Sequence, residues 1–512
     1  MGLTTAWKRL SPTQLNVAIQ TFALISIFFE GYDQGVMGGV NASPNYVTEV
    51  NIGLPDGTVT NTTKQGGIVS IYYLGAIVGC FVGGWAADRI GRINGLFWAA
   101  LFALIGGALQ AATQSADFIL VARVVTGLGT GALTGITPVL VSEVSSAEHR
   151  GGFLGYVFIA NYLGISVAYW LDFGLSFVNH GYSALRWRFL LAFQCLPALL
   201  LLAGIKLLPD SPRYLASVGR NEEAREVLYS VRGSSNPEAV EQEFNEIVAM
   251  AEDTKPASPI EFIKIMFGLD KSQGAHLGRR AWFPVLLRQA GYSQIKQNGL
   301  AGGLNTIGII GTIISAQIVD KFGRRKCLMW GAAGLFAVNL IAAALYEASR
   351  HDPSKAASIA PAAVTMLFLF NLVYASTWGT VAFLIPTEIF PSRMRAQGNG
   401  FGITGWAIGV GWTVLVNPIM FENIQSRTYF LFAGLNFIWI GIVYLIYPET
   451  SSRSLESIEA MFTTSPFYWQ MEKAYAENKD MFATAAKPGM LEDERLSKEK
   501  QLECSHDELT HV

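Results

Sequence analysis

Three ionisable residues stand inside apolar stretches long enough to cross a bilayer, where a charge needs a partner. Glu30 and Asp33 lie in the stretch 20–40, and Arg123 lies in 118–141. A charge at the bilayer centre costs about 2.5–3.5 kcal/mol even on the lenient insertion scale. Asp33 and Arg123 can offset this cost by neutralising each other. Glu30 is either a second protonatable site or, as we favour, a residue that reaches the external interface.

The elements that hold these residues are apolar helices. The chain of 512 residues is 51% hydrophobic and 15% charged, whereas soluble domains are about 25% charged. A bilayer needs about 20 apolar helical residues for each span, and eleven segments qualify. They are 20–40, 65–87, 94–114, 118–141, 152–173, 189–208, 299–319, 327–346, 362–387, 396–421 and 428–447. This predicts an all-α polytopic protein whose partner is the lipid bilayer, and the net charge of −2 predicts no nucleic-acid partner.

Lys and Arg are concentrated in four short loops, which we expect in the cytoplasm. These loops are 88–95, 142–151, 320–326 and 388–395. The loop 41–64 has only Lys64 against Glu49 and Asp56, so we expect it outside, with both termini cytoplasmic. Asn61, followed by two threonines, is a possible glycosylation acceptor there.

The two halves of the chain repeat the same charged signals. Residues 88–92 (Asp-Arg-Ile-Gly-Arg) correspond to 320–324 (Asp-Lys-Phe-Gly-Arg), 232 positions later. The other paired signals are Glu143 to Arg150 against Glu388 to Arg395, and 209–213 against 448–450. Two similar halves of membrane helices are typical of a transporter that holds its substrate between them near mid-membrane.

These motifs resemble the sugar porter family of the major facilitator superfamily, in particular its fungal-type proton-coupled members, over about 15–460. The motifs that carry the resemblance are Gly31-Tyr32-Asp33, Asp88-Arg89-x-Gly91-Arg92, Arg123, Pro138 to Arg150, Asp210-Ser211-Pro212-Arg213, Asp320 to Arg325, Pro386-Thr387-Glu388 and Pro448-Glu449-Thr450. The resemblance implies the major facilitator fold, with two six-helix halves and nominally twelve spans. It also implies that Asp33 is the proton-coupling acid and Arg123 its partner; the alternative is a static ion pair that never titrates.

The resemblance implies a cytoplasmic gate made of charged residues from both halves, which would close the inner side in one state. Its expected members are Asp88, Arg89, Arg92, Glu143, Arg150, Asp320, Arg324, Arg325, Glu388 and Arg395. The alternative is that these residues only fix topology and loop structure. Isolated exposed pairs contribute about 0–1 kcal/mol, so only a network could act as a gate.

Amide and aromatic side chains inside the spans are candidates for binding a sugar. They are Asn161, Asn305, Trp378, Phe383 and Trp406. Such an Asn can instead be a helix-packing residue, and such a Trp an interface anchor. Relatives commonly carry Gln where this chain has Phe158, and Trp where it has Phe383, so we expect a substrate that differs from plain glucose.

The seventh span of the family is missing as an apolar run. Residues 281–298 contain Arg288 and Lys296 and no run of 18 apolar residues. Three interpretations are open: a faulty gene prediction or splice form, a real but inactive copy, or a short, broken segment that still crosses.

Taken together, the chain is predicted to take up a monosaccharide or polyol by alternating access and proton symport, as a monomer in the plasma membrane. No enzymatic chemistry, metal or cofactor other than the coupling proton is expected. The alternatives are a facilitative uniporter, a sugar sensor that does not transport, and an inactive truncated form. The predicted parts are a cytoplasmic N-terminus (1–19), a first membrane half (20–208), a central cytoplasmic loop (209–280), a second membrane half (281–447) and a cytoplasmic tail (448–512). In the central loop we expect two short helices, one capped by Asn221 and one that starts at Pro237. We expect the tail to be disordered after about 466.

Overall fold

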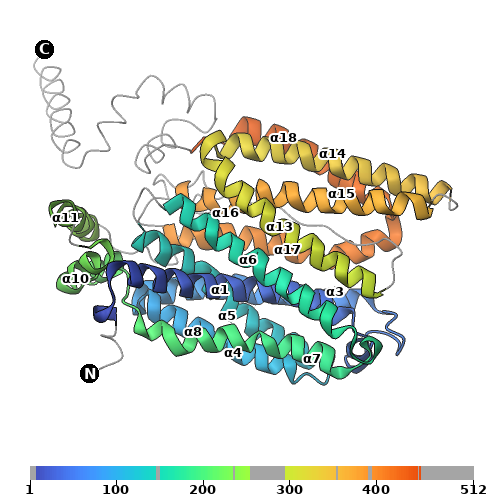
Figure 1. Ribbon diagram of the computed structural model, residues 1–512, viewed down its shortest axis with the longest axis horizontal. Helices are drawn as coiled ribbons and strands as arrows, with labels where there is room; N and C mark the ends of the chain where they lie inside the picture. Colours follow the sequence, from blue (N-terminus) through green and yellow to red (C-terminus); the bar gives the residue numbers. More distant parts are fainter. Residues whose placement is uncertain are drawn as a thin grey trace, which may run out of the picture.

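The computed structural model describes residues 7–145, 150–233, 237–253, 294–352, 356–389, 395–447 and 449–450, and these fold into helices (Figure 1). The helices are α1 (Pro12–Asn41), α2 (Pro44–Glu49), α3 (Thr62–Ile90), α4 (Arg92–Ala111), α5 (Ala116–Val144), α6 (Arg150–Leu175), α7 (Ala184–Phe193), α8 (Cys195–Gly204), α9 (Pro212–Ser217), α10 (Asn221–Arg232), α11 (Pro237–Asp253), α13 (Gln294–Phe322), α14 (Arg324–His351), α15 (Ala356–Ser376), α16 (Trp378–Ile389), α17 (Arg395–Ile424) and α18 (Arg427–Ile446).

Within this described part, eleven helical segments are long and apolar enough to cross a bilayer. They coincide with the eleven predicted from hydropathy, which confirms the all-α polytopic class. Two of them are broken: α7 and α8 form one span, and α15 and α16 form another. The first helix begins at Pro12, earlier than the predicted 20, because Ser11 caps it and Gln14 completes a capping box.

The first half of the bundle is built around α5. This helix packs against α1, α3 and α4, while α6 packs along α1. Small residues permit this close packing: a Cβ on Gly131 of α5 would collide with the backbone of Ala76 on α3, and one on Gly31 of α1 with the carbonyl of Asn161 on α6.

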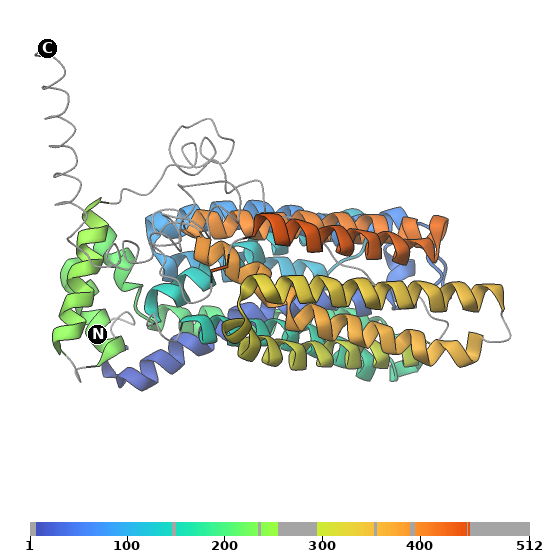
Figure 2. The ribbon, with the colours of Figure 1, turned by 90° about the horizontal axis from the view of Figure 1, so that it is seen from above.

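The second half consists of α13 to α18, and it meets the first half along two antiparallel helix pairs (Figure 2). In one pair, α3 lies against α17, with the Ser70 hydroxyl donating to the Gly411 carbonyl oxygen at 3.0 Å. In the other, α6 lies against α13, with the Trp170 indole donating to Thr306 Oγ1 at 3.0 Å. Both halves therefore share a long interface parallel to their helices.

The two ends of the bundle differ in charge. We call the end where α3 stops and α4 starts the basic end, since it carries Arg89 and Arg92. The helices α9, α10 and α11 also lie there, with Arg232 of α10 donating to the Val144 carbonyl oxygen at 2.6 Å. Because α13 is antiparallel to α6, the residues 320–326 at its C-terminal end lie at the basic end as well.

The start of α13 lies at the opposite end of the bundle. Gly299 near its beginning faces Phe173, close to the end of α6. The end of α11 at Asp253 and the start of α13 at Gln294 therefore lie at opposite ends of the bundle. The predicted incomplete span, 281–298, falls almost entirely outside the described residues.

The helices outside the spans agree with the prediction for the central loop, with one correction. Helix α11 begins at Pro237 as expected, but Asn221 is the first residue of α10 and does not cap it; Arg220 holds the cap position without a side-chain hydrogen bond. Lys8 forms an ion pair with Glu226 of α10 at 2.6 Å. The Asn16 amide donates to the Val231 carbonyl oxygen at 2.8 Å, so this helical unit is attached to α1.

Cysteine labelling tests the direction of α13. In a chain with Cys504→Ser, we expect Gln297→Cys to react with a membrane-impermeant maleimide from the same side as Thr58→Cys, and Ser217→Cys to react from the other side. The reason is that Gln297 and Thr58 lie at the end away from α9. Labelling of Gln297→Cys from the side of Ser217→Cys would contradict the direction of α13.

Candidate functional site

An acid–base pair lies in the core of the first half. Arg123 Nη1 on α5 is 3.1 Å from Asp33 Oδ1 and 3.3 Å from Oδ2 on α1, and the two side chains are 1% and 0% exposed. The guanidinium carbon lies 4.5 Å from the ring centroid of Tyr72 on α3. The side chains of Gln110 on α4 and Tyr72 also lie close to the Asp33 carboxylate. Four helices thus surround a pair that the sequence predicted from residue types alone.

Glu30 is also buried, which contradicts the expectation that it reaches the external interface. It is 5% exposed, and Gln34 Nε2 donates to its Oε1 at 3.0 Å. The physical reason is that α1 packs against α5. The Glu30 side chain lies close to Thr134 of α5, within the bundle rather than at its end.

Aromatic rings from both halves meet in one cluster. Phe158 of α6 and Phe383 of α16 have ring centroids 5.0 Å apart, and Phe383 and Trp406 of α17 are 5.7 Å apart. Tyr73 of α3 lies 5.7 Å from Trp406. We call these four residues the inter-half aromatic cluster. Such a cluster offers flat apolar faces at the junction of the two halves.

The two predicted asparagines lie on the facing helices of the second inter-half contact. Asn161 on α6 is half-buried, and in the part of the chain that the structure describes its side-chain amide has no hydrogen-bond partner. Asn305 on α13 donates to the Ala301 carbonyl oxygen of its own helix at 2.8 Å. Asn161 is therefore the amide with unused donors and acceptors near this interface.

The structure does not bring Trp378 to the inter-half aromatic cluster. Its indole N–H donates to the Leu328 carbonyl oxygen at 3.1 Å, and its ring packs at 5.7 Å on Trp439 inside the second half. Tyr72 and Tyr73, which the sequence analysis did not select, take part in the two sites instead. The signal for them was a pair of polar-tipped rings in the apolar span 65–87.

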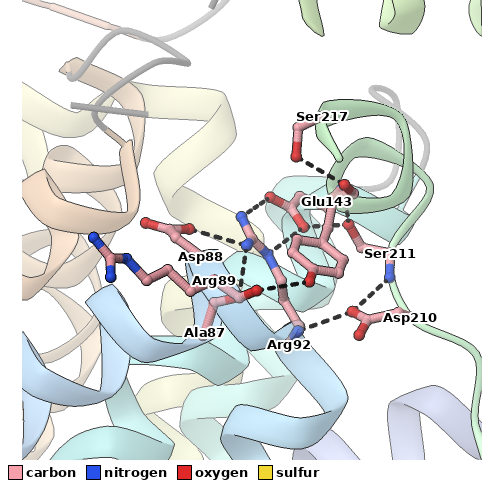
Figure 3. A network of polar contacts seen from close by, with 9 residues as sticks. Ala87, Asp88, Arg89, Arg92, Glu143, Asp210, Ser211 and Ser217 are labelled. Carbon is pink, nitrogen blue, oxygen red and sulfur yellow. Dashed lines mark hydrogen bonds and ion pairs between the residues drawn. The ribbon is translucent and has the colours of Figure 1, made fainter. Parts of the chain in front are cut away.

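A dense charged network occupies the basic end of the first half (Figure 3). Arg92 donates from Nη2 and Nε to Glu143 at 3.0 and 3.1 Å. Its Nη1 lies 2.9 Å from Asp88 Oδ1. The Ser211 hydroxyl donates to Glu143 Oε2, the oxygen that also accepts from Arg92 Nε. These side chains hold α3, α4 and α5 together with the start of α9.

A carboxylate also caps the start of α4. Gly91 precedes this helix at φ 97°, a region that glycine adopts without strain. Asp210 Oδ1 then accepts the Arg92 backbone N–H at 2.9 Å, one of the donors that a helix start leaves unpaired. Burial raises the pKa of Asp210 above its usual range, and the N–H groups of Ser211 and Arg92 act against that rise.

The second half repeats this cap. Gly323 precedes α14 at φ 88°, and Glu449 accepts the backbone N–H of Arg324 at 2.8 Å and of Arg325 at 3.3 Å. Asp210 and Glu449 were recognised as motif residues but not as site residues. The repeat that pairs 209–213 with 448–450 was the signal for their common role.

The structure describes the side chains of only some of the predicted gate residues. The side chains of Arg150, Asp320, Glu388 and Arg395 lie outside what the structure describes. Arg89 is exposed and lies 4.5 Å from the Trp85 ring centroid. Arg325 donates to the Tyr444 carbonyl oxygen at 2.6 Å, within its own half. The gating role of this set stays a prediction.

The predicted glycosylation acceptor lies at the end of the bundle opposite the basic end. Asn61 is exposed, and its Oδ1 caps α3 by accepting the Lys64 backbone N–H at 2.8 Å. Glycosylation at this position stays a prediction.

Comparison with solved structures defines the class of protein. The chain aligns with the proton:xylose symporter XylE bound to 6-bromo-6-deoxy-D-glucose, with a TM-score of 0.71, 21% identity, and coverage of 88% of this chain and 99% of that one. The inward-open form of XylE from E. coli aligns with a TM-score of 0.66. The fold is thus that of the major facilitator superfamily of membrane transporters.

The family follows from sequence comparison. The family described as "Sugar (and other) transporter" matches residues 18–275 and 282–462, and the chain belongs to it. The MFS-type transporter criB of Aspergillus cristatus is 30% identical over 454 residues, which cover 86% of this chain and 91% of that protein. Sugar transporter STL1 of Saccharomyces cerevisiae is 29% identical, over 87% of this chain and 80% of that protein.

Replacing Arg92, the central cation of the network at the basic end, tests how much this network stabilises the fold. We expect Arg92→Ala to destabilise the fold by about 1–3 kcal/mol, because Glu143 and Asp88, which are 12% and 18% exposed, would lose their shared counter-charge. Thermal unfolding of the purified protein in detergent measures this. The control is Arg89→Ala, which removes an exposed cation–π contact worth about 0.5–1 kcal/mol. Equal losses in the two variants would contradict the network.

Proposed function

We propose that the protein is a proton-coupled symporter of a monosaccharide or polyol that works by alternating access in the plasma membrane. In this proposal the basic end and both termini face the cytoplasm, as the positive-inside rule indicates. The protein acts as a monomer and needs no cofactor other than the coupling proton.

The observation that supports coupling is the buried pair of Asp33 and Arg123, 0% and 1% exposed. When water reaches Asp33 and protonates it, the attraction that holds α1 to α5 is lost and Arg123 keeps only its contact with Tyr72. Since α1 packs on α6 and α6 packs on α13 of the other half, a change at the pair is transmitted to the inter-half contact. Proton binding and the relative movement of the halves are then linked.

Substrate recognition is assigned to the inter-half aromatic cluster and the Asn161 amide. The C–H faces of a sugar ring pack on aromatic rings, and its hydroxyls need donors and acceptors. In the described part of the chain, the Trp406 indole N–H and the Asn161 amide have no protein partner. Because aromatic surface exceeds amide groups here, the site favours a substrate with few exposed hydroxyls, such as a deoxy sugar.

Neutralising the acid tests the coupling. We expect Asp33→Asn to abolish accumulation of radiolabelled D-xylose, D-glucose or sorbitol against a gradient in vesicles, because the variant cannot exchange a proton at this position. Exchange of labelled for unlabelled sugar should persist, since it needs no net proton movement. Undiminished accumulation by Asp33→Asn would contradict proton coupling there. If the wild type took up sugar without alkalinising the medium, it would be a uniporter.

Removing an aromatic face tests the binding site. We expect Trp406→Leu to raise the half-saturating concentration of the transported sugar about tenfold, equivalent to about 1.4 kcal/mol, because one stacking surface is lost. The matched control is Trp412→Leu on the same helix, whose side chain is 66% exposed on the outer face. An equal effect of the two substitutions on transport would exclude the aromatic cluster as the binding surface.

A further inference from the structure

Glu30 is a buried carboxyl that the proposed mechanism does not use. It lies one helical turn from Asp33 on α1, so the two side chains are neighbours. It accepts a hydrogen bond from Gln34 Nε2 at 3.0 Å, and the Thr134 side chain of α5 lies close to it. Among the residues that the structure describes, no Lys, Arg or His forms an ion pair with it.

An ionised Glu30 would have no positive charge of its own to balance it among the described residues. The core of the first half holds two carboxyls, on Glu30 and Asp33, but the guanidinium of Arg123 balances only one of them. With both acids ionised, the group would carry a net negative charge inside the bilayer, which costs several kcal/mol. The titratable or charged groups that face Glu30 are Asp33 on its own helix and Tyr72, Tyr73 and Cys80 on α3, with Arg123 on α5 facing Asp33. None of these except Arg123 supplies a positive charge, so one proton restores neutrality.

We propose that Glu30 is a second proton-binding site, which holds a proton while Asp33 and Arg123 are ionised and shares that proton with Asp33 when the pair separates. The three residues then form one titrating unit with a single net proton. This inference extends the proposed proton coupling to a second carboxyl, and so rests on that proposal for its role in transport.

The position of Glu30 connects this unit to the interface between the halves. Cys80 of α3, which faces Glu30, points its thiol at the Gly400 carbonyl oxygen of α17, with 3.7 Å between sulfur and oxygen. Thr134, which lies close to Glu30, is on α5 beside α3. Ionising Glu30 would place a charge next to this contact, and would favour separation of α3 from α17 and entry of water. A protonated Glu30 leaves the contact closed.

Infrared spectroscopy tests the proton on Glu30 without requiring transport, so a failure of the proposed function would not be confused with a failure of this inference. The purified full-length protein in lipid should show the carbonyl-stretch band of a protonated carboxylic acid at neutral pH. We expect Glu30→Gln to remove this band and Glu30→Asp to shift its frequency. Glu226→Gln, which changes an exposed carboxylate paired with Lys8, should leave it unchanged.

The sharing of the proton is tested with Asp33→Asn. In this variant Arg123 has only Glu30 to balance it, so the band should disappear at a lower pH than in the wild type. Retention of the wild-type band in Glu30→Gln would overturn the proposal, as would a band absent from the wild type at neutral pH. An unchanged titration in Asp33→Asn would overturn the sharing. Because Glu30→Asp assigns the band by its shift, the test stands even if Glu30→Gln does not fold.

Discussion

A charge inside a lipid-embedded bundle is tolerated only when other groups of the protein offset it, and the pair of Asp33 and Arg123 shows how far this requirement organises the fold. The pair joins α1 to α5, Tyr72 adds the ring of α3 beneath the guanidinium, and Gln110 adds an amide from α4. Four helices are therefore held in one register by a single ionic contact. Sliding α1 or α5 by a turn would leave a buried charge unpaired, at a cost of several kcal/mol.

The same requirement applies at the basic end, where polar groups also meet water and form more contacts. Each half starts one helix directly after a glycine with positive φ, and each places a carboxylate from a distant part of the chain over the new helix start. Asp210 does this for Arg92, and Glu449 does it for Arg324. Carboxylate caps satisfy otherwise unpaired N–H groups and complement the positive end of the helix dipole. The internal repeat in the sequence thus corresponds to one local structure that occurs in both halves.

The sequence allowed the spans, the repeat and the acid–base pair to be predicted, since each follows from a general penalty: polar backbone and charge are costly in lipid. It did not allow the direction of individual side chains to be predicted. Glu30 was expected at an interface and is buried, because α1 packs on α5 there. Trp378 was expected near a substrate, and its indole instead bonds the Leu328 carbonyl oxygen and its ring packs on Trp439. Such outcomes depend on which neighbouring helix each face meets.

The direction of α13 follows from packing rather than from hydropathy. If α13 began at the basic end, the second half would be inverted relative to the first. Helix α13 would then run parallel to α6, and Thr306 would no longer face Trp170, whose indole bonds it at 3.0 Å. The capped start of α14 would also move away from the basic end. The direction of α13 therefore keeps the arrangement in which the two halves match, with its start at the end of the bundle opposite to α11.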